Sequence, residues 1–171
     1  MEVIDNINRR LGDDLKDVIR PGSKVRIAAA TFSIYAFEAL QRELSQIESR
    51  VILDRLIATW ENEVVEFKRA SADFDTDKIG RYISALSNEA NLSGSDAGWL
   101  VFGVDDATRT VVGTDYRLEP ERLAGLKLQV AQGADITIRN AHVLDHLDGR
   151  VILFEVPPAP RGIPISWKGH Y

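Results

Sequence analysis

The sequence predicts an α+β fold, preceded by a helix–strand–helix fragment. Two observations support this prediction. Short apolar runs of strand character alternate with stretches in which apolar residues recur every three or four positions, as they do on one face of a helix. The alternation also begins again near Val51, which indicates that residues 1–49 and 52–171 are separate units.

The composition excludes several classes of protein. With 171 residues, 44% hydrophobic and 27% charged, the chain has the make-up of a soluble globular protein. No apolar run approaches the roughly 18 to 20 residues of a membrane span, and the start of the chain has no signal-peptide pattern. The absence of cysteine excludes disulfides, thiolate zinc sites and cysteine nucleophiles. We therefore expect a cytoplasmic protein with no membrane partner.

A helix–strand–helix order is expected over residues 1–49. The first helix carries apolar residues at helical spacing, namely Ile4, Ile7, Leu11, Leu15 and Val18. Pro21-Gly22-Ser23 breaks it, and residues 24–28 alternate like a strand. Ser33 can cap a second helix whose apolar side holds Phe37, Leu40, Leu44 and Ile47. The lone strand near Ala28 has unpaired edges, which favours a homodimer.

The second unit opens with a short helix and a strand. The helix carries Leu53, Leu56, Ile57 and Trp60 and ends before Glu61, and the strand covers residues 64–67. Asp75 or Thr76 then caps a helix whose inner face holds Ile79, Ile83, Leu86 and Ala90. Residues 91–96 have the composition of a loop, and the apolar run 99–104 predicts a buried central strand.

Strands and a helix follow one another in the rest of the second unit. Asp105-Asp106 turns the chain into a strand near residues 110–112, and Pro120 begins a helix with Leu123, Leu126, Leu128 and Val130. Two strands, 136–146 and 150–156, are joined by the hairpin signal Asp148-Gly149. Residues 157–171 read as irregular, and the abrupt end at Tyr171 favours a missing C-terminal domain, with a packed tail as the alternative.

Three carboxylates are candidates for a metal site. Glu61 lies at a helix-to-strand corner, Glu66 lies on the strand, and Asp105 (or Asp106) follows the central strand. If the two strands are neighbours, these groups converge and could hold a divalent ion that activates water for phosphodiester cleavage. The spacing by itself fits a solvated or salt-bridged edge better. No cofactor is required otherwise.

The candidates for binding nucleic acid are basic, aromatic and amide side chains. They are Lys68, Arg69, Lys78, Arg81, Asn88, Arg161, Trp167 and Lys168, with Tyr171 as a further aromatic neighbour. Aromatic residues interleaved with cations suit single strands, because bases stack and phosphates pair. An ordinary solvated surface explains Lys78 and Arg81 equally well, and Asn88 could instead cap its helix. The net charge of −5 opposes phosphate binding, although a local basic stripe can exist on an acidic protein.

Four motifs taken together resemble the Schlafen AlbA-type domain over about residues 52–171: ENEVVEFKRA, IGRYISALSNEAN, GWLVFGVDD and VVGTDY. The resemblance implies a compact α+β domain, with a mixed sheet and flanking helices, that binds nucleic acid. Such domains stand at the front of longer bacterial proteins, often ahead of an ATPase-like or winged-helix region. Some animal relatives cut RNA with three carboxylates, which would fall here on Glu61, Glu66 and Asp105 and would use Mg or Mn.

Residues 1–49 resemble the start of a phospholipase-D-like domain of bacterial helicases, without its HxK motif. The leading hypothesis is therefore a nucleic-acid-binding module, for single-stranded or structured RNA or for DNA, within a larger bacterial regulatory or helicase-associated protein. It would not be catalytic by itself. The first alternative is a metal-dependent endoribonuclease. The second is a protein-interaction domain whose acidic face meets a partner.

Overall fold

The computed structural model describes residues 34–59 and 63–169. The chain divides into two units, Met1–Asp54 and Arg55–Tyr171. In the first unit the described residues belong to helix α2, Ile34–Ala58. The helix predicted over residues 4–18 and the strand predicted over 24–28 lie outside the described residues, as does most of the segment that resembles a phospholipase-D-like domain. The domain boundary placed between residues 49 and 52 stays a prediction.

Helix α2 is continuous, so the predicted break near Ser49 and the separate short helix after it were wrong. Its 25 residues contain no proline or glycine that could interrupt them. The Ser49 hydroxyl donates to the Ser45 carbonyl one turn earlier at 2.7 Å, which satisfies this polar group inside the helix. Arg50 and Asp54 form an i,i+4 ion pair at 2.9 Å, which also favours a continuous helix.

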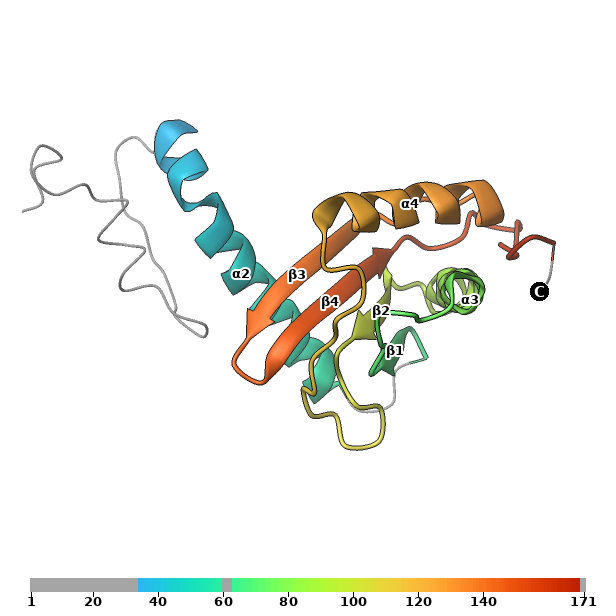
Figure 1. The fold of residues 1–171 in the computed structure, drawn as a ribbon. Coiled ribbons are helices and arrows are strands. Elements are labelled where there is room, and N and C mark those ends of the chain that lie inside the picture. Colours follow the sequence, from blue (N-terminus) through green and yellow to red (C-terminus); the bar gives the residue numbers. More distant parts are fainter. Residues whose placement is uncertain (1–33, 60–62, 170–171) are drawn as a thin grey trace, which may run out of the picture. The chain divides into compact units, whose positions relative to one another are not determined.

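The second unit is built on a mixed sheet with the strand order β1-β2-β4-β3 (Figure 1). Strands β1 (Val65–Lys68) and β2 (Gly98–Phe102) are parallel, whereas β2 and β3 (Asn140–His146) are both antiparallel to β4 (Gly149–Val156). All five residues of β2 are buried, which confirms the predicted central strand. The predicted α+β fold, with helices flanking a mixed sheet, is confirmed.

Helices α3 (Thr76–Ser93) and α4 (Pro120–Ala134) contribute to one core with the sheet. Asp75 caps α3 by accepting a hydrogen bond from the Asp77 backbone N–H at 2.7 Å. The predicted inner face of α3 is confirmed, since Ile79, Ile83, Leu86 and Ala90 are all buried. The helix continues to Ser93 and ends at Gly94, whose φ of 66° is the left-handed conformation of a helix C-cap, so the predicted loop begins later than expected.

Three local predictions need correction. The hairpin turn is Leu147-Asp148, because Gly149 already pairs with His146 as the first residue of β4. Near residue 111 there is one isolated bridge, between Val104 and Val111, instead of a strand. Leu128 is 61% exposed, although the other three leucine and valine positions predicted for this helix are buried. None of the described helices has the length and apolar character that crossing a membrane requires.

Candidate nucleic-acid interface

The candidate carboxylates are held by neighbouring protein groups. Glu66 forms an ion pair with Lys68, two residues along the same face of β1. Asp105 is 9% exposed and contacts Arg69, whose Nε and Nη2 both lie 2.7 Å from Asp105 Oδ2. Glu61 lies outside the described residues. Among the residues that are described, no three His, Cys, Asp or Glu side chains are grouped closely enough to hold a metal ion.

The surroundings of Asp105 give it a structural role in the turn that follows β2. Its second carboxylate oxygen accepts hydrogen bonds from the Thr108 hydroxyl and the Thr108 backbone N–H, each at 2.8 Å. These two hydrogen bonds, together with the Arg69 guanidinium, lower the pKa of Asp105 to about 2. The carboxylate therefore closes a turn and ties it to the end of β1. Asp106, the alternative candidate, is exposed beside Arg109 at 3.6 Å.

Asn88 binds the C-terminal segment. Its side-chain amide donates to the Ile165 carbonyl and accepts from the Ile165 N–H, both at 2.8 Å. The helix ends five residues later, so Asn88 does not cap it. In this arrangement both hydrogen-bonding groups of the Asn88 amide are occupied by the protein. The preceding Ser87 reinforces the attachment, since its hydroxyl donates to the Pro157 carbonyl at 3.0 Å.

Trp167 is part of the core. Its side chain is 4% exposed and lies against Gly80 of α3 and Gly133 of α4, where any Cβ would come within 2.1 to 2.8 Å of the indole ring. The indole N–H donates to Asp77 Oδ1 at 3.0 Å. A base cannot stack on this ring while the segment stays packed, which corrects the expectation that Trp167 is presented to a ligand. Arg161, in the same segment, is exposed.

Lys168 is engaged beside Trp167. Its Nζ lies 2.7 Å from Asp77 Oδ1, and this contact lowers the pKa of Asp77, with a further contribution from the Trp167 N–H. The charge of Asp77 is thus balanced within the protein. Tyr171, the further aromatic candidate, lies outside the described residues.

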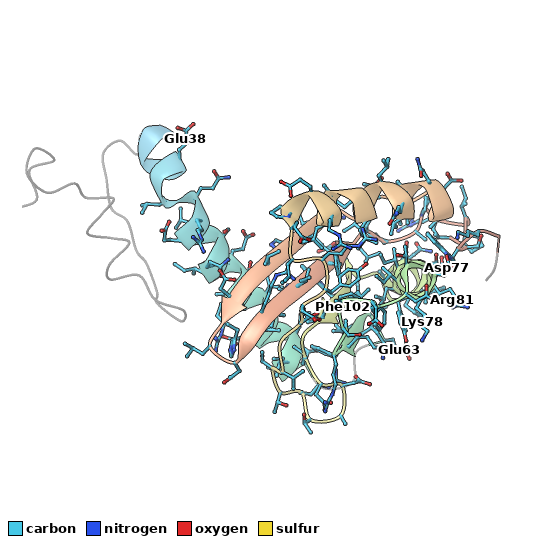
Figure 2. The ribbon with its side chains drawn as sticks, in the orientation of Figure 1. Glu38, Glu63, Asp77, Lys78, Arg81 and Phe102 are labelled. Atoms are coloured by element: carbon cyan, nitrogen blue, oxygen red, sulfur yellow. The ribbon has the colours of Figure 1, made fainter. Side chains whose placement is uncertain are left out.

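The other candidate cations lie on β1 and α3. Lys78 and Arg81 are exposed and lie three residues apart on α3, and Figure 2 shows them with Asp77 on the side of the helix that faces away from the sheet. Lys68 Nζ lies 5.1 Å from the ring centroid of Tyr82, the residue one turn after Lys78. Burial lowers the pKa of Lys68, but the hydrogen bond and the charge of Glu66 raise it by more. The net shift of the pKa is upward, so Lys68 stays charged. We call Lys68, Lys78, Arg81 and Tyr82 the basic α3 face.

The family model for the Schlafen AlbA_2 domain matches residues 61–171. The chain belongs to this family. Among solved structures, this AlbA_2 chain is similar to the N-terminal domain of an ATP-dependent DNA helicase RecG-related protein from Nitrosomonas europaea, at 25% identity and a TM-score of 0.47 over 70% of this chain and 79% of that one. A protein from Corynebacterium diphtheriae is 15% identical, with a TM-score of 0.47 over 75% of this chain and 27% of that one. A search of curated proteins finds no match.

The motifs of this AlbA_2 domain hold its segments together. The serine and asparagine of the α3 motif fix the C-terminal segment, as described for Ser87 and Asn88. In the VVGTDY motif, the buried Thr114 hydroxyl donates to the Ala70 carbonyl and accepts from the Tyr116 N–H. The contacts to Ala70, Pro157 and Ile165 could not be assigned from the sequence, because their partners are 44 to 77 residues apart along the chain.

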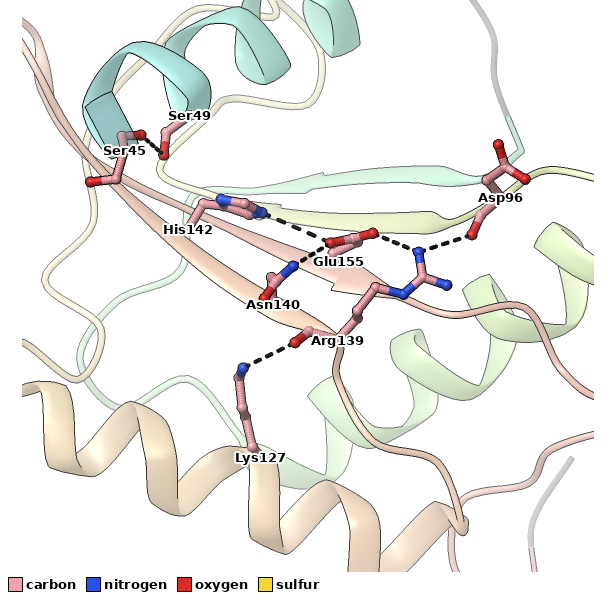
Figure 3. A network of polar contacts seen from close by, with 8 residues as sticks. All are labelled: Ser45, Ser49, Asp96, Lys127, Arg139, Asn140, His142 and Glu155. Atoms are coloured by element: carbon pink, nitrogen blue, oxygen red, sulfur yellow. Dashed lines mark hydrogen bonds and ion pairs between the residues drawn. The ribbon is translucent and has the colours of Figure 1, made fainter. Parts of the chain in front are cut away.

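A second polar network in the AlbA_2 domain, around Glu155, was not predicted from the sequence. Glu155 of β4 accepts hydrogen bonds from Arg139 at 2.7 Å and from Asn140 at 2.8 Å, and His142 Nε2 lies 3.9 Å from it (Figure 3). Burial raises the pKa of Glu155, but Asn140 and Arg139 lower it by more, so the net shift is downward. Asn140 is paired with Glu155 in the β3–β4 register, so the network connects the edge strand to its neighbour.

Proposed function

We propose that this AlbA_2 chain is a module that binds RNA or DNA through the basic α3 face and is not catalytic by itself. The observation that carries the proposal is the pair Lys78 and Arg81, which have no ion-pair partner among the described residues. The adjacent acidic group on the helix, Asp77, is bound to Lys168 at 2.7 Å, and Arg81 acts on the pKa of Asp77 through its charge without forming an ion pair with it. Two cations on one helix face are therefore left to attract phosphates.

Tyr82 supports single-stranded nucleic acid as the ligand. The residue is half-buried, packs against the edge of the core and lies beside Lys68. A cation and an aromatic ring placed together can contact a phosphate and the face of the neighbouring base, whatever the base is. This local arrangement answers the objection from the net charge of −5, since the field at one face depends on the charges near it.

The test is fluorescence anisotropy with labelled single-stranded and duplex RNA and DNA, in the presence of a chelator. We compare the wild type with the double variant Lys78→Ala/Arg81→Ala and with the control Arg122→Ala/Lys127→Ala. The control removes the same number of positive charges from α4. We expect the first variant to weaken binding at least tenfold and the control to change it much less. Equal losses would contradict the assignment of this face, and no binding by the wild type would overturn the proposal.

The same experiment separates the other hypotheses. Binding in the presence of a chelator is expected, because Glu66 and Asp105 are paired with Lys68 and Arg69. Cleavage that requires Mg or Mn and is lost in Glu66→Ala would instead favour the endoribonuclease. We also propose that the module acts in the cytoplasm within a larger bacterial regulatory or helicase-associated protein, a context that the resemblance of residues 1–49 supports.

A further inference from the structure

An open hollow of about 540 Å³ lies at one end of the sheet. It is formed by the chain that follows β1, by the segment between β2 and α4, which Figure 1 draws in yellow, and by the start of β4. Its size falls within the range of small-molecule sites in proteins. The hollow is separate from the basic α3 face, but it begins at Arg69, directly after Lys68.

The floor of the hollow is closely packed, hydrogen-bonded backbone. Gly113 and Gly149 have φ values of 77° and 129°, and a Cβ on Gly149 would lie 2.7 Å from the Gly113 Cα. The Thr114 N–H donates to the Arg150 carbonyl at 2.9 Å, which joins the two sides. Arg150 in turn donates to the Tyr116 and Arg117 carbonyls at 2.7 and 3.3 Å. A ligand would therefore meet a preformed surface.

The walls combine exposed apolar side chains with charges. Val112 is 42% exposed and Leu118 is 61% exposed, although both line a concave surface. The Arg69 side chain is 72% exposed, and Asp105 fixes its orientation. Asp115 also lines the hollow and would repel a phosphate placed inside it. The chemistry that fits is a flat, uncharged, partly apolar group inside the hollow, joined to an anion near Arg69.

We propose that this hollow takes one unstacked base of a bound nucleic-acid strand, with the adjoining phosphate next to Arg69. Val112 and Leu118 contact the base, while Asp115 can accept a hydrogen bond from an exocyclic amine of cytosine, adenine or guanine. From Arg69 the strand continues to Lys68, which belongs to the basic α3 face. The inference rests on the proposed function, because it names a base-binding subsite of the same interface.

The test compares two oligomers of about ten nucleotides, oligo-dC and an abasic oligomer of equal length and charge. Because contact with a base adds to the affinity, we expect the wild type to bind oligo-dC about tenfold more tightly than the abasic oligomer. In a Tyr82→Ala background, which removes the other proposed base contact, the variant Val112→Ala/Leu118→Ala should lose most of this preference. The control Leu128→Ala removes a leucine on α4 with the same 61% exposure, outside the hollow, and should keep it.

The outcomes distinguish the hollow from the interface as a whole. Equal affinity of the wild type for both oligomers, falling with salt, would overturn the base-binding hollow and leave the proposed function standing. A preference that persists in Val112→Ala/Leu118→Ala in the Tyr82→Ala background would place the base elsewhere and also overturn the inference. No binding of either oligomer would overturn the base-binding hollow for single-stranded DNA, and the anisotropy measurements with RNA and with duplexes would then decide the proposed function.

Discussion

Replacing Asn88 with alanine is expected to release the C-terminal segment from α3. The change deletes two hydrogen bonds of 2.8 Å and leaves the Ile165 N–H and carbonyl without their partner. The Ile165 residue is 7% exposed, so water reaches these groups poorly. An unsatisfied buried polar group costs about 1 to 3 kcal/mol. Because the segment can relax toward solvent, we expect a total loss of about 2 to 4 kcal/mol in the free energy of unfolding.

The measurement is urea unfolding followed by circular dichroism and tryptophan fluorescence. Asn91→Ala is the matched control, since Asn91 lies on the same helix and its side chain makes no hydrogen bond among the described residues. It should lose less than about 0.5 kcal/mol, as surface changes usually do. The indole of Trp167 should also become more exposed in Asn88→Ala, with red-shifted emission. Equally small losses of unfolding free energy in both variants would refute the conclusion that Asn88 holds the C-terminal segment on α3.

Two further predictions concern packing and pH. Gly80→Ala should destabilise the fold by about 1 to 3 kcal/mol, because the added Cβ would lie 2.1 Å from the Trp167 ring. Gly125→Ala is the control: a Cβ there meets open space, so the change should be neutral or stabilising by about 0.5 to 1 kcal/mol. Thermal unfolding of both variants checks this, and equal effects would contradict it. Asp105 has its pKa lowered from 3.8 to about 2, so its contribution is complete above about pH 4 and is lost as the pH falls toward 2. Asp105→Asn should therefore lower the free energy of unfolding at pH 7 but not at pH 2. An equal loss at both pH values would argue against a stabilising role of the ionised Asp105 carboxylate in the turn.

Local signals in the sequence predict much of the fold. The cap at Asp75 or Thr76, the inner face of α3 and the start of α4 at Pro120 depend on neighbouring residues only; the last two are confirmed, and the cap is Asp75. The break predicted near Ser49 was wrong, because an apolar pattern that restarts does not end a helix when no proline or glycine stands there. The hairpin turn was predicted one residue too late. Gly149 is not part of the turn; it is a glycine because the backbone of Gly113 lies close to it.

The candidate site was harder to predict, because its side chains have partners far away in the sequence. Asn88 and Trp167 have the residue types of a nucleic-acid site, yet both hold the C-terminal segment in place. Two glycines inside helices, Gly80 and Gly133, were the available signal, since a helical glycine often marks a close contact. Tyr82 was missed, although its position one turn after Lys78 places both on one face.

The salt dependence of nucleic-acid binding shows whether Lys78 and Arg81 contact phosphates. The logarithm of the affinity falls linearly with the logarithm of the salt concentration, by about 0.7 to 0.9 for each phosphate that is neutralised. Removing Lys78 and Arg81 together should therefore reduce the slope by about 1.4 to 1.8. We expect this smaller slope, and we expect binding to need no divalent metal. An unchanged slope in the double variant, or binding that does not depend on salt, would contradict it.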